Sequence, residues 1–192
     1  MGICQSVTNI VRIAFDNDID RMILSEGLPE GRFDFFARVS DTDWPFWQKP
    51  LQTELKLKLG VIGRLERRET DVLLLQYRNP NAGGLKPPGS LDGLRRSLNL
   101  SKYTTGNVTT NSLYERDQTI SGLQDFLRVS FALPIIDQTG LTNKYDFLLK
   151  WNDAVPIHPN KEGIKQAVLD QLGLELVPGR ALVEMLVVEK VN

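Results

Sequence analysis

The chain of 192 residues is 41% hydrophobic and 24% charged, which is enough apolar material to bury a core in one large domain or two small ones. Its 23 basic and 24 acidic residues give a net charge of −1, so no overall field favours a nucleic-acid partner or an anionic membrane. The single cysteine, Cys4, excludes an internal disulfide and any multi-cysteine metal site, and we expect neither a metal nor a cofactor.

The first ordered region, residues 1–78, is predicted to contain a helix, two strands, a second helix and two further strands. Apolar residues recur at helical spacing in both helices, and a Leu-Gly pair ends the second helix at Gly60. The six elements are predicted at residues 6–15, 19–24, 32–39, 50–59, 61–67 and 71–77.

Residues 79–118 differ in composition from the rest of the chain. They are rich in Gly, Pro, Ser and Thr and have little apolar periodicity, which is typical of a linker or a loop excursion. We therefore predict a boundary on each side of this segment.

The second ordered region, residues 119–192, repeats the order of elements found in the first. A helix ends before Pro134, and residues 135–151 have the pattern of a β-hairpin, with a turn near Gly140 between two extended segments. A further helix ends at Gly173, and two strands follow, separated by a predicted turn at Pro178.

The two regions also agree in register. The sequence KYDFLLKW lies 112 residues after RFDFFARV, and the Leu-Gly pair at Gly173 lies 113 residues after the pair at Gly60. Such an offset indicates an internal duplication. We therefore predict an α+β fold of two duplicated helix-strand-strand-helix-strand-strand halves, with helices packed on an antiparallel-rich sheet.

Three large aromatic residues, Trp44, Phe46 and Trp47, lie in a polar connection of the first region. One interpretation is that they anchor the following helix to the core. The other is that they stay partly exposed and form a recognition patch for a partner. These three residues are the predicted binding site.

Catalytic motifs are absent from the sequence: it contains no G-x-S-x-G, P-loop, G-x-G-x-x-G or H-E-x-x-H. The lone histidine, His158, lies between two prolines and is interpreted as a solvated loop residue. Asp137 and Asp146 are interpreted as structural, in a turn and on a strand. We predict no catalytic residues; the alternative is a hydrolase-like enzyme that uses His158 with nearby carboxylates.

The second region carries a pattern of the form D-x-TGL-x-x-x-YDF-x-L-x-W followed by LGL-x-L. Its residues here are Asp137, Thr139, Gly140, Leu141, Tyr145, Asp146, Phe147, Leu149, Trp151, Leu172, Gly173, Leu174 and Leu176. On these residues the chain resembles the soil-associated bacterial protein family, a domain of unknown function common in acidobacteria and planctomycete-like lineages. The first region fits through residues 32–34 and 67–75. Arg67 stands where that family commonly has histidine, which argues against chemistry based on that residue.

The resemblance implies a location rather than an activity. Members of that family often follow secretion signals or membrane-embedded segments, so it implies a periplasmic or cell-surface protein, although this sequence shows no signal-peptide pattern and no apolar run long enough to span a membrane. We predict a non-catalytic binding or interaction module of the cell envelope, whose partner is a protein or an envelope component.

Overall fold

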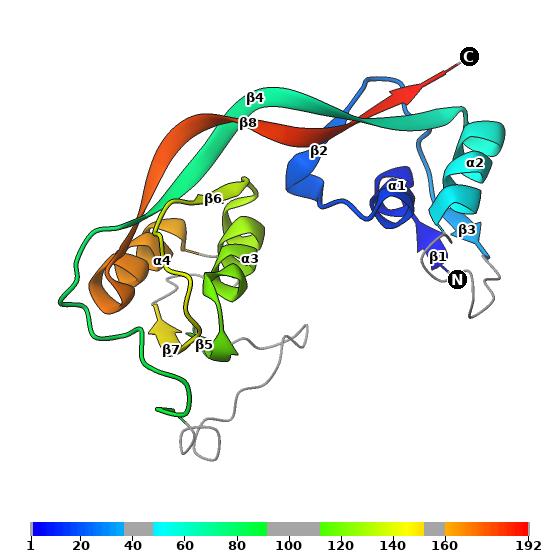
Figure 1. Cartoon of the computed structure of the whole chain (residues 1–192). Helices are drawn as coiled ribbons and strands as arrows, with labels where there is room; N and C mark the ends of the chain where they lie inside the picture. Colours follow the sequence, from blue (N-terminus) through cyan, green and yellow to red (C-terminus); the bar gives the residue numbers. More distant parts are fainter. Residues whose placement is uncertain (1, 37–47, 92–111, 152–159, 192) are drawn as a thin grey trace. The chain divides into compact units, whose positions relative to one another are not determined.

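The computed structural model describes residues 2–36, 48–91, 112–151 and 160–191, and the chain forms two compact units (Figure 1). Unit 1 comprises Met1–Thr70 with Ala181–Asn192, and unit 2 comprises Asp71–Arg180. Two strands of 17 residues, β4 (Val61–Tyr77) and β8 (Leu174–Lys190), each contribute one end to unit 1 and the other end to unit 2.

Unit 1 contains two helices, three short strands and the ends of the two long ones. Its shorter elements are β1 (Gly2–Gln5), α1 (Val7–Phe15), the 3-10 turn Ile19–Arg21, β2 (Met22–Leu24), β3 (Phe33–Phe35) and α2 (Gln48–Leu59). Ser6 begins α1, because its side chain accepts a hydrogen bond from the Asn9 amide at 3.2 Å. The apolar face of α1 packs against α2 and β8; this core consists of Val7, Ile10, Val11, Ala14, Leu51, Leu55, Val61, Leu186 and Val188.

Unit 2 has the same kinds of element, and α3 and α4 lie on the same side of β4 and β8 (Figure 1). Its shorter elements are β5 (Ser112–Gln118), α3 (Ile120–Phe131), β6 (Ile135–Asp137), β7 (Tyr145–Lys150), α4 (Lys161–Ala167) and a π-helical turn (Val168–Leu172). Its core is larger and consists of Leu73, Leu75, Ile120, Leu123, Leu127, Phe131, Ile135, Phe147, Leu149, Ile164, Ala167, Val168, Leu172, Leu174 and Leu176.

The strands form one four-stranded sheet, of order β2-β8-β4-β6, and two two-stranded sheets. β2 runs parallel to β8 and β6 runs parallel to β4, whereas β1 with β3 and β5 with β7 are antiparallel. The prediction of a mixed helix and sheet fold is confirmed. The sheets are less antiparallel than we predicted, because the two short edge strands, β2 and β6, each pair in parallel with a long strand from the other half of the sequence.

The predicted hairpin at residues 135–151 is wrong. β6 pairs with β4, where the Leu73 amide donates to the Pro134 carbonyl at 3.0 Å and the Gln138 amide donates to the Leu75 carbonyl at 2.8 Å. β7 pairs instead with β5. The local turn at Asp137 does form, since its Oδ1 accepts the Thr139 amide at 2.8 Å, but the strands on either side of it enter different sheets.

The two predicted strand pairs at the ends of the halves are also wrong, since each is a single strand. The charged residues Arg67, Arg68 and Glu69 continue β4 with exposed side chains. Pro178 and Gly179 lie inside β8, where a Cβ at Gly179 would approach Leu74 Cδ1 to 2.9 Å. Glycine therefore serves close strand packing here rather than a turn. Each half reads strand-helix-strand-strand-helix-strand, in place of the predicted order.

The antiparallel pairing of β1 with β3 recurs 113 and 112 residues later in β5 and β7. The paired residues are Gly2 with Phe35 and Gln5 with Phe33, then Glu115 with Phe147 and Gln118 with Tyr145. Both ladders have an irregularity between the two pairs. At that irregularity Cys4 has φ 56° and Asp117 has φ 50°. Each sheet therefore contains a left-handed bulge residue at the corresponding position.

The parallel pairings recur in the same way. Met22 pairs with Leu186 in unit 1, and Ile135 pairs with Leu73 in unit 2. Each helix before a long strand ends at a glycine of positive φ, Gly60 at 62° and Gly173 at 71°, as the Leu-Gly pairs predicted.

The bounds of the compact units differ from those of the predicted repeats 1–78 and 119–192 and of the predicted linker 79–118. Strand β5 begins at Ser112, inside the predicted linker, and Leu91 is buried. Compact units and sequence repeats divide a chain by different criteria, so the predicted repeat bounds stay a prediction.

A candidate ligand-binding cleft in unit 2

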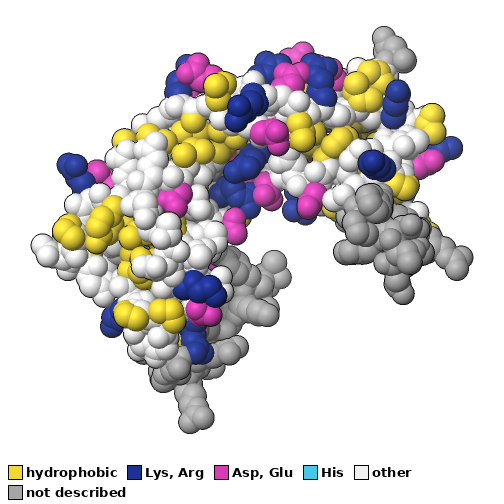
Figure 2. Space-filling model, in the orientation of Figure 1, with side chains coloured by type: hydrophobic (Ala, Val, Ile, Leu, Met, Phe, Trp, Pro, Cys, Tyr) yellow, Lys and Arg dark blue, Asp and Glu magenta, His cyan; other side chains and the backbone are white. Residues whose placement is uncertain are grey.

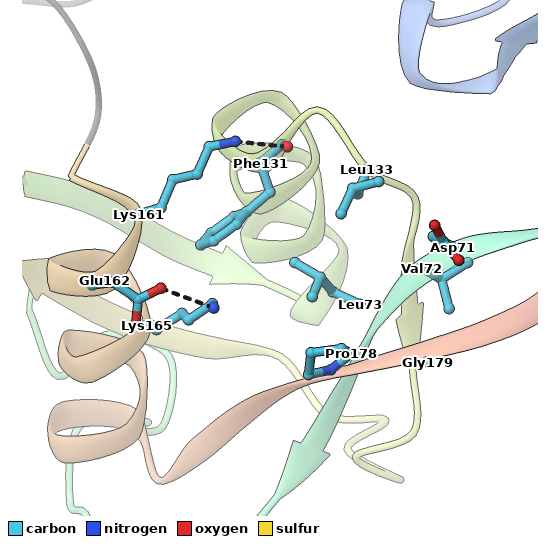
Figure 3. A pocket seen from close by; sticks show the side chains of 10 residues that line it. All are labelled: Asp71, Val72, Leu73, Phe131, Leu133, Lys161, Glu162, Lys165, Pro178 and Gly179. Atoms are coloured by element: carbon cyan, nitrogen blue, oxygen red, sulfur yellow. Dashed lines mark hydrogen bonds and ion pairs between the residues drawn. The ribbon is translucent and has the colours of Figure 1, made fainter.

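A cleft of about 380 Å³ opens on unit 2 between β4, β8 and the facing ends of α3 and α4 (Figure 3). Its volume lies within the range of pockets that hold small organic ligands. The lining residues are Asp71, Val72, Leu73, Phe131, Leu133, Lys161, Glu162, Lys165, Pro178 and Gly179.

The floor of the cleft is apolar and rigidly held. Val72 and Leu73 come from β4 and are 2% and 4% exposed, and Phe131, the last residue of α3, is 5% exposed. Leu133 and Pro178 are less buried and complete this apolar surface. Val72 and Leu73 belong to a strand and Phe131 to a helix, so this buried part of the floor exists before any ligand arrives.

Two lysines of α4 approach the Phe131 ring at one end of the cleft, and in Figure 3 their ammonium groups lie on either side of the ring. The Nζ atoms of Lys161 and Lys165 each lie 5.9 Å from the ring centroid. Lys161 Nζ donates to the Phe131 carbonyl at 3.2 Å and so gives one of the last carbonyl groups of α3 a hydrogen-bond donor. Lys165 Nζ pairs with Glu162 Oε1 at 3.0 Å. An ammonium carries three N–H donors, so each lysine retains donors beyond these contacts.

Asp71 lies at the opposite end of the cleft, beyond the apolar floor (Figure 3). Its side chain is 81% exposed, and its Oδ1 lies 3.7 Å from Arg180 Nε. A pair this long and this exposed holds the carboxylate weakly. The cleft therefore presents ammonium groups at one end, an acceptor at the other and an apolar surface between them.

Among the residues that the structure describes, those lining the cleft include no serine, cysteine or histidine, the side chains that most often serve as an activated nucleophile or its general base. Within residues 2–36, 48–91, 112–151 and 160–191, no group of three or more His, Cys, Asp or Glu side chains is arranged to hold a metal ion. The arrangement is suited to holding a ligand by charge and apolar contact.

Asp146 is a buried carboxylate outside the cleft, and its contacts are structural. It is 0% exposed, and its two oxygens accept the amides of Asp117 at 2.9 Å and Leu91 at 3.1 Å. Burial by itself raises the pKa of Asp146, but the amides of Asp117, Leu91 and Gly89, with the charge of Arg116, outweigh burial and hold the pKa below its ordinary value. The carboxylate joins three chain segments.

The residues considered for function or structure in the sequence analysis fall into two groups. Trp44, Phe46 and Trp47, the predicted binding patch, and His158, the residue of the alternative enzyme hypothesis, lie outside the described residues. Asp137 and Asp146 both have the structural contacts expected from the sequence.

Sequence reasoning missed the cleft. Its one local signal is the spacing of Lys161 and Lys165, which places two cations on one face of a helix. Phe131 and Asp71 lie next to strands whose partners were predicted incorrectly. The sequence pattern therefore did not indicate that these two residues lie close to α4.

Basic and acidic side chains are intermixed on the face shown in Figure 2, with apolar side chains between them. This agrees with the near-zero net charge of the chain. Among the helices in the described parts of the chain, none has the length and apolar character that a bilayer crossing requires.

Comparison with known proteins identifies a family and no activity. No curated protein and no solved structure matches the chain. The family described as "Protein of unknown function (DUF3738)" matches residues 8–191, which include nearly all of both units. The chain therefore belongs to the DUF3738 family of proteins of unknown function.

Proposed function

We propose that the protein is a non-catalytic binding module and that the unit 2 cleft is its ligand site. The observation that carries this proposal is the approach of Lys161 and Lys165 to the buried Phe131 ring, at the end of an apolar floor. A preformed surface of this kind binds with little ordering cost. The partner is a protein or an envelope component that presents a small apolar group.

The experiment uses the full-length ¹⁵N-labelled chain and a defined panel of probes. The panel consists of N-acetylated tripeptides ending in Leu, Phe, Lys or Glu, each as free acid and as amide, together with decanoate. Binding at the cleft shifts the backbone amide signals of Leu133, Lys165 and Gly179. Absence of shifts with every probe, or shifts confined to other surfaces, contradicts the proposal.

A matched pair of variants separates the cleft from the surface around it. Leu133→Trp fills the cleft and is expected to abolish the shifts, because Leu133 is a half-buried lining residue. Val129→Trp adds the same bulk on α3 at a position that is 72% exposed and outside the lining, and it is expected to leave them unchanged. Equal effects of the two variants would count against the cleft.

We also propose that the protein acts outside the cytoplasmic membrane of a soil-associated bacterium. The support is the sequence resemblance in the YDF and LGL segments, since the family match itself carries no location. Protease treatment of intact and permeabilised cells of the source bacterium tests this. Degradation in intact cells, with a cytoplasmic marker preserved, is expected; protection until permeabilisation contradicts it.

We further propose that the two halves arose by duplication of one strand-helix-strand-strand-helix-strand repeat. The support is the shared offset of unlike features: the bulge residues Cys4 and Asp117, the ladder registers, and the helix-ending residues Gly60 and Gly173. On this proposal the long strand of each repeat completes the core of the other. An experimental structure in which the two repeats fail to superimpose would overturn it.

The patch formed by Trp44, Phe46 and Trp47 is kept as a sequence-based proposal for a second contact with a protein partner. Three aromatics in a polar segment suit a recognition surface. Once a partner of the cleft is known, Trp44→Ala with Trp47→Ala is expected to weaken that partner at unchanged thermal stability. A loss of stability instead supports a role in anchoring the helix.

A further inference from the structure

The two lysines of the cleft distinguish it from a simple apolar pocket. Each ammonium lies 5.9 Å from the centroid of the same phenyl ring, so a group bound to either ammonium lies close to Phe131. A hydrogen bond from an ammonium group is stronger when the acceptor carries a negative charge. The end of the cleft near α4 therefore suits an anion attached to an apolar group.

Glu162 already occupies part of this anion position. Its carboxylate pairs with Lys165 at 3.0 Å, yet its side chain is 82% exposed whereas that of Lys165 is 32% exposed. An exposed pair of this type is weak and easily exchanged. The Glu162 carboxylate therefore resembles the group that a ligand would present, and a ligand carboxylate would compete with it for Lys165.

The far end of the cleft favours one source of that carboxylate. Asp71 offers exposed acceptor oxygens beyond the apolar floor, and a peptide chain carries N–H donors upstream of its C-terminal carboxylate. A fatty acid has nothing to donate there. The charge arrangement thus matches the C-terminal end of a peptide.

We propose that the unit 2 cleft recognises the free C-terminus of a partner polypeptide, with the terminal carboxylate on Lys165 in place of Glu162 and an apolar last side chain against Phe131 and Leu133. The inference rests on the proposed function, since it names the ligand class of the same cleft. Upstream N–H groups of the peptide face Asp71.

The test compares Ac-Ala-Ala-Leu as the free acid and as the amide, titrated into the full-length chain by isothermal calorimetry. The free acid is expected to bind at least about tenfold more tightly, because the charged hydrogen bonds to Lys165 are lost in the amide. Equal affinity of acid and amide overturns the C-terminus proposal and leaves the proposed function standing, whereas absence of binding by every probe of the panel removes both.

Two substitutions are expected to act in opposite directions on the free acid. Lys165→Gln is expected to weaken it about tenfold and to abolish the preference over the amide. Glu162→Gln is expected to strengthen it several-fold, because it removes the competing carboxylate. A purely structural role for the Lys165–Glu162 pair would make both variants weaken binding, and that result overturns the proposal.

Lys144→Gln is the matched control. Lys144 pairs with Asp117 at 3.2 Å on the surface of unit 2 and does not line the cleft, so its loss is expected to leave both affinities unchanged. If a Lys165 variant unfolds, as shown by circular dichroism, Glu162→Gln decides the question alone. If decanoate binds more tightly than the free-acid peptide, the proposal of a peptide C-terminus is overturned and a lipid carboxylate is the ligand class instead.

Discussion

Unit 1 and unit 2 share a plan but differ in how much they bury. Each has an antiparallel two-stranded sheet with a bulge, a helix that packs beside a short parallel strand, and a second helix that ends at a glycine before a long strand. Among the described residues, the buried apolar cluster has fifteen members in unit 2 and nine in unit 1. The same arrangement therefore supports cores of quite different size.

The clearest single difference is between Asp34 and Asp146, which lie 112 residues apart on β3 and β7. Each accepts the amide of the positive-φ bulge residue of its sheet, Cys4 in unit 1 and Asp117 in unit 2. Asp34 is exposed, whereas Asp146 also binds the segment that ends at Leu91 and is fully buried. The Asp146 carboxylate is an internal crosslink, whereas the Asp34 carboxylate lies on the surface.

A second difference concerns the helix ends beside the cleft. In unit 1 Gln52 Nε2 donates to the Ala14 carbonyl at 2.8 Å near the end of α1, and in unit 2 Lys161 Nζ donates to the Phe131 carbonyl at the end of α3. The residue 113 positions before Lys165 is Gln52, a neutral amide. Unit 2 therefore differs from unit 1 by cationic side chains at the site we assign to ligand binding.

The largest expected difference between the two units is in whether a fragment containing each one folds by itself. Residues 71–180 form one contiguous unit that contains its own apolar cluster, so this fragment is expected to fold alone and unfold cooperatively. Residues 1–78 lack Leu186 and Val188 and the partner strand of β2, so this fragment is expected to stay unfolded. Circular dichroism and ¹H–¹⁵N spectra of both fragments check this.

A folded 1–78 fragment with an unfolded 71–180 fragment would contradict the division into these units. It would favour the sequence repeats as the folding units instead. A mixture of the two halves, 1–78 and 112–192, provides the control, because together they contain both strands that each core requires.

Asp146→Ala compared with Asp34→Ala gives the next largest effect. The first change leaves backbone amides of unit 2 without their acceptor, and burying unpaired amides costs about 1–3 kcal/mol each, so we expect a loss of about 3–5 kcal/mol. Asp34→Ala affects an exposed carboxylate and is expected to cost less than about 1 kcal/mol. Urea unfolding measures both, and equal losses would refute the comparison.

The same carboxylate gives unit 2 a dependence on acid. The pKa of Asp146 is lower in the folded protein than its ordinary value, so its stabilisation is present above the pKa of the unfolded chain, about 3.9. It is lost as the pH falls through the lower folded value, because the unfolded state then binds the additional proton. The free-energy difference between wild type and Asp146→Asn is expected to stay constant above about pH 5 and to shrink below pH 4.

Local features of both units could be predicted from the sequence. Ser6 at the start of α1 and the glycines at the ends of α2 and of the π-helical turn were predicted correctly, because capping and left-handed glycine depend on residues close together in the chain. The turn at Asp137 was predicted for the same reason.

Strand partners could not be predicted from local pattern. Residues 135–151 look like a hairpin, but Ile135 pairs with Leu73, which is far away in the sequence, and residues 67–70 and Pro178 look like breaks in strands that run on through them. The cleft depends on these pairings, since Asp71 and Leu73 on β4 meet α4 only after the sheet has formed. The prediction of helices therefore succeeded, whereas the cleft was not predicted.

The smallest expected effect compares Gly173→Ala with Gly60→Ala. A Cβ would lie 2.1 Å from the Asn79 carbonyl oxygen at Gly173 and 2.6 Å from the Val191 carbonyl oxygen at Gly60, and both residues have positive φ. Left-handed strain costs about 1–2 kcal/mol, and the closer backbone contact adds to it at Gly173, so we expect losses of about 2–3 and about 1–2 kcal/mol. Gly83→Ala is the control, because nothing lies within 4 Å of its Cβ and it should leave stability unchanged. The carbonyl of each glycine also accepts an amide from the residue just after a long strand, Arg78 at Gly173 and Val191 at Gly60. A larger loss of stability for Gly60→Ala would therefore mean that the more tightly packed of these two junctions lies in unit 1, the reverse of the expected order.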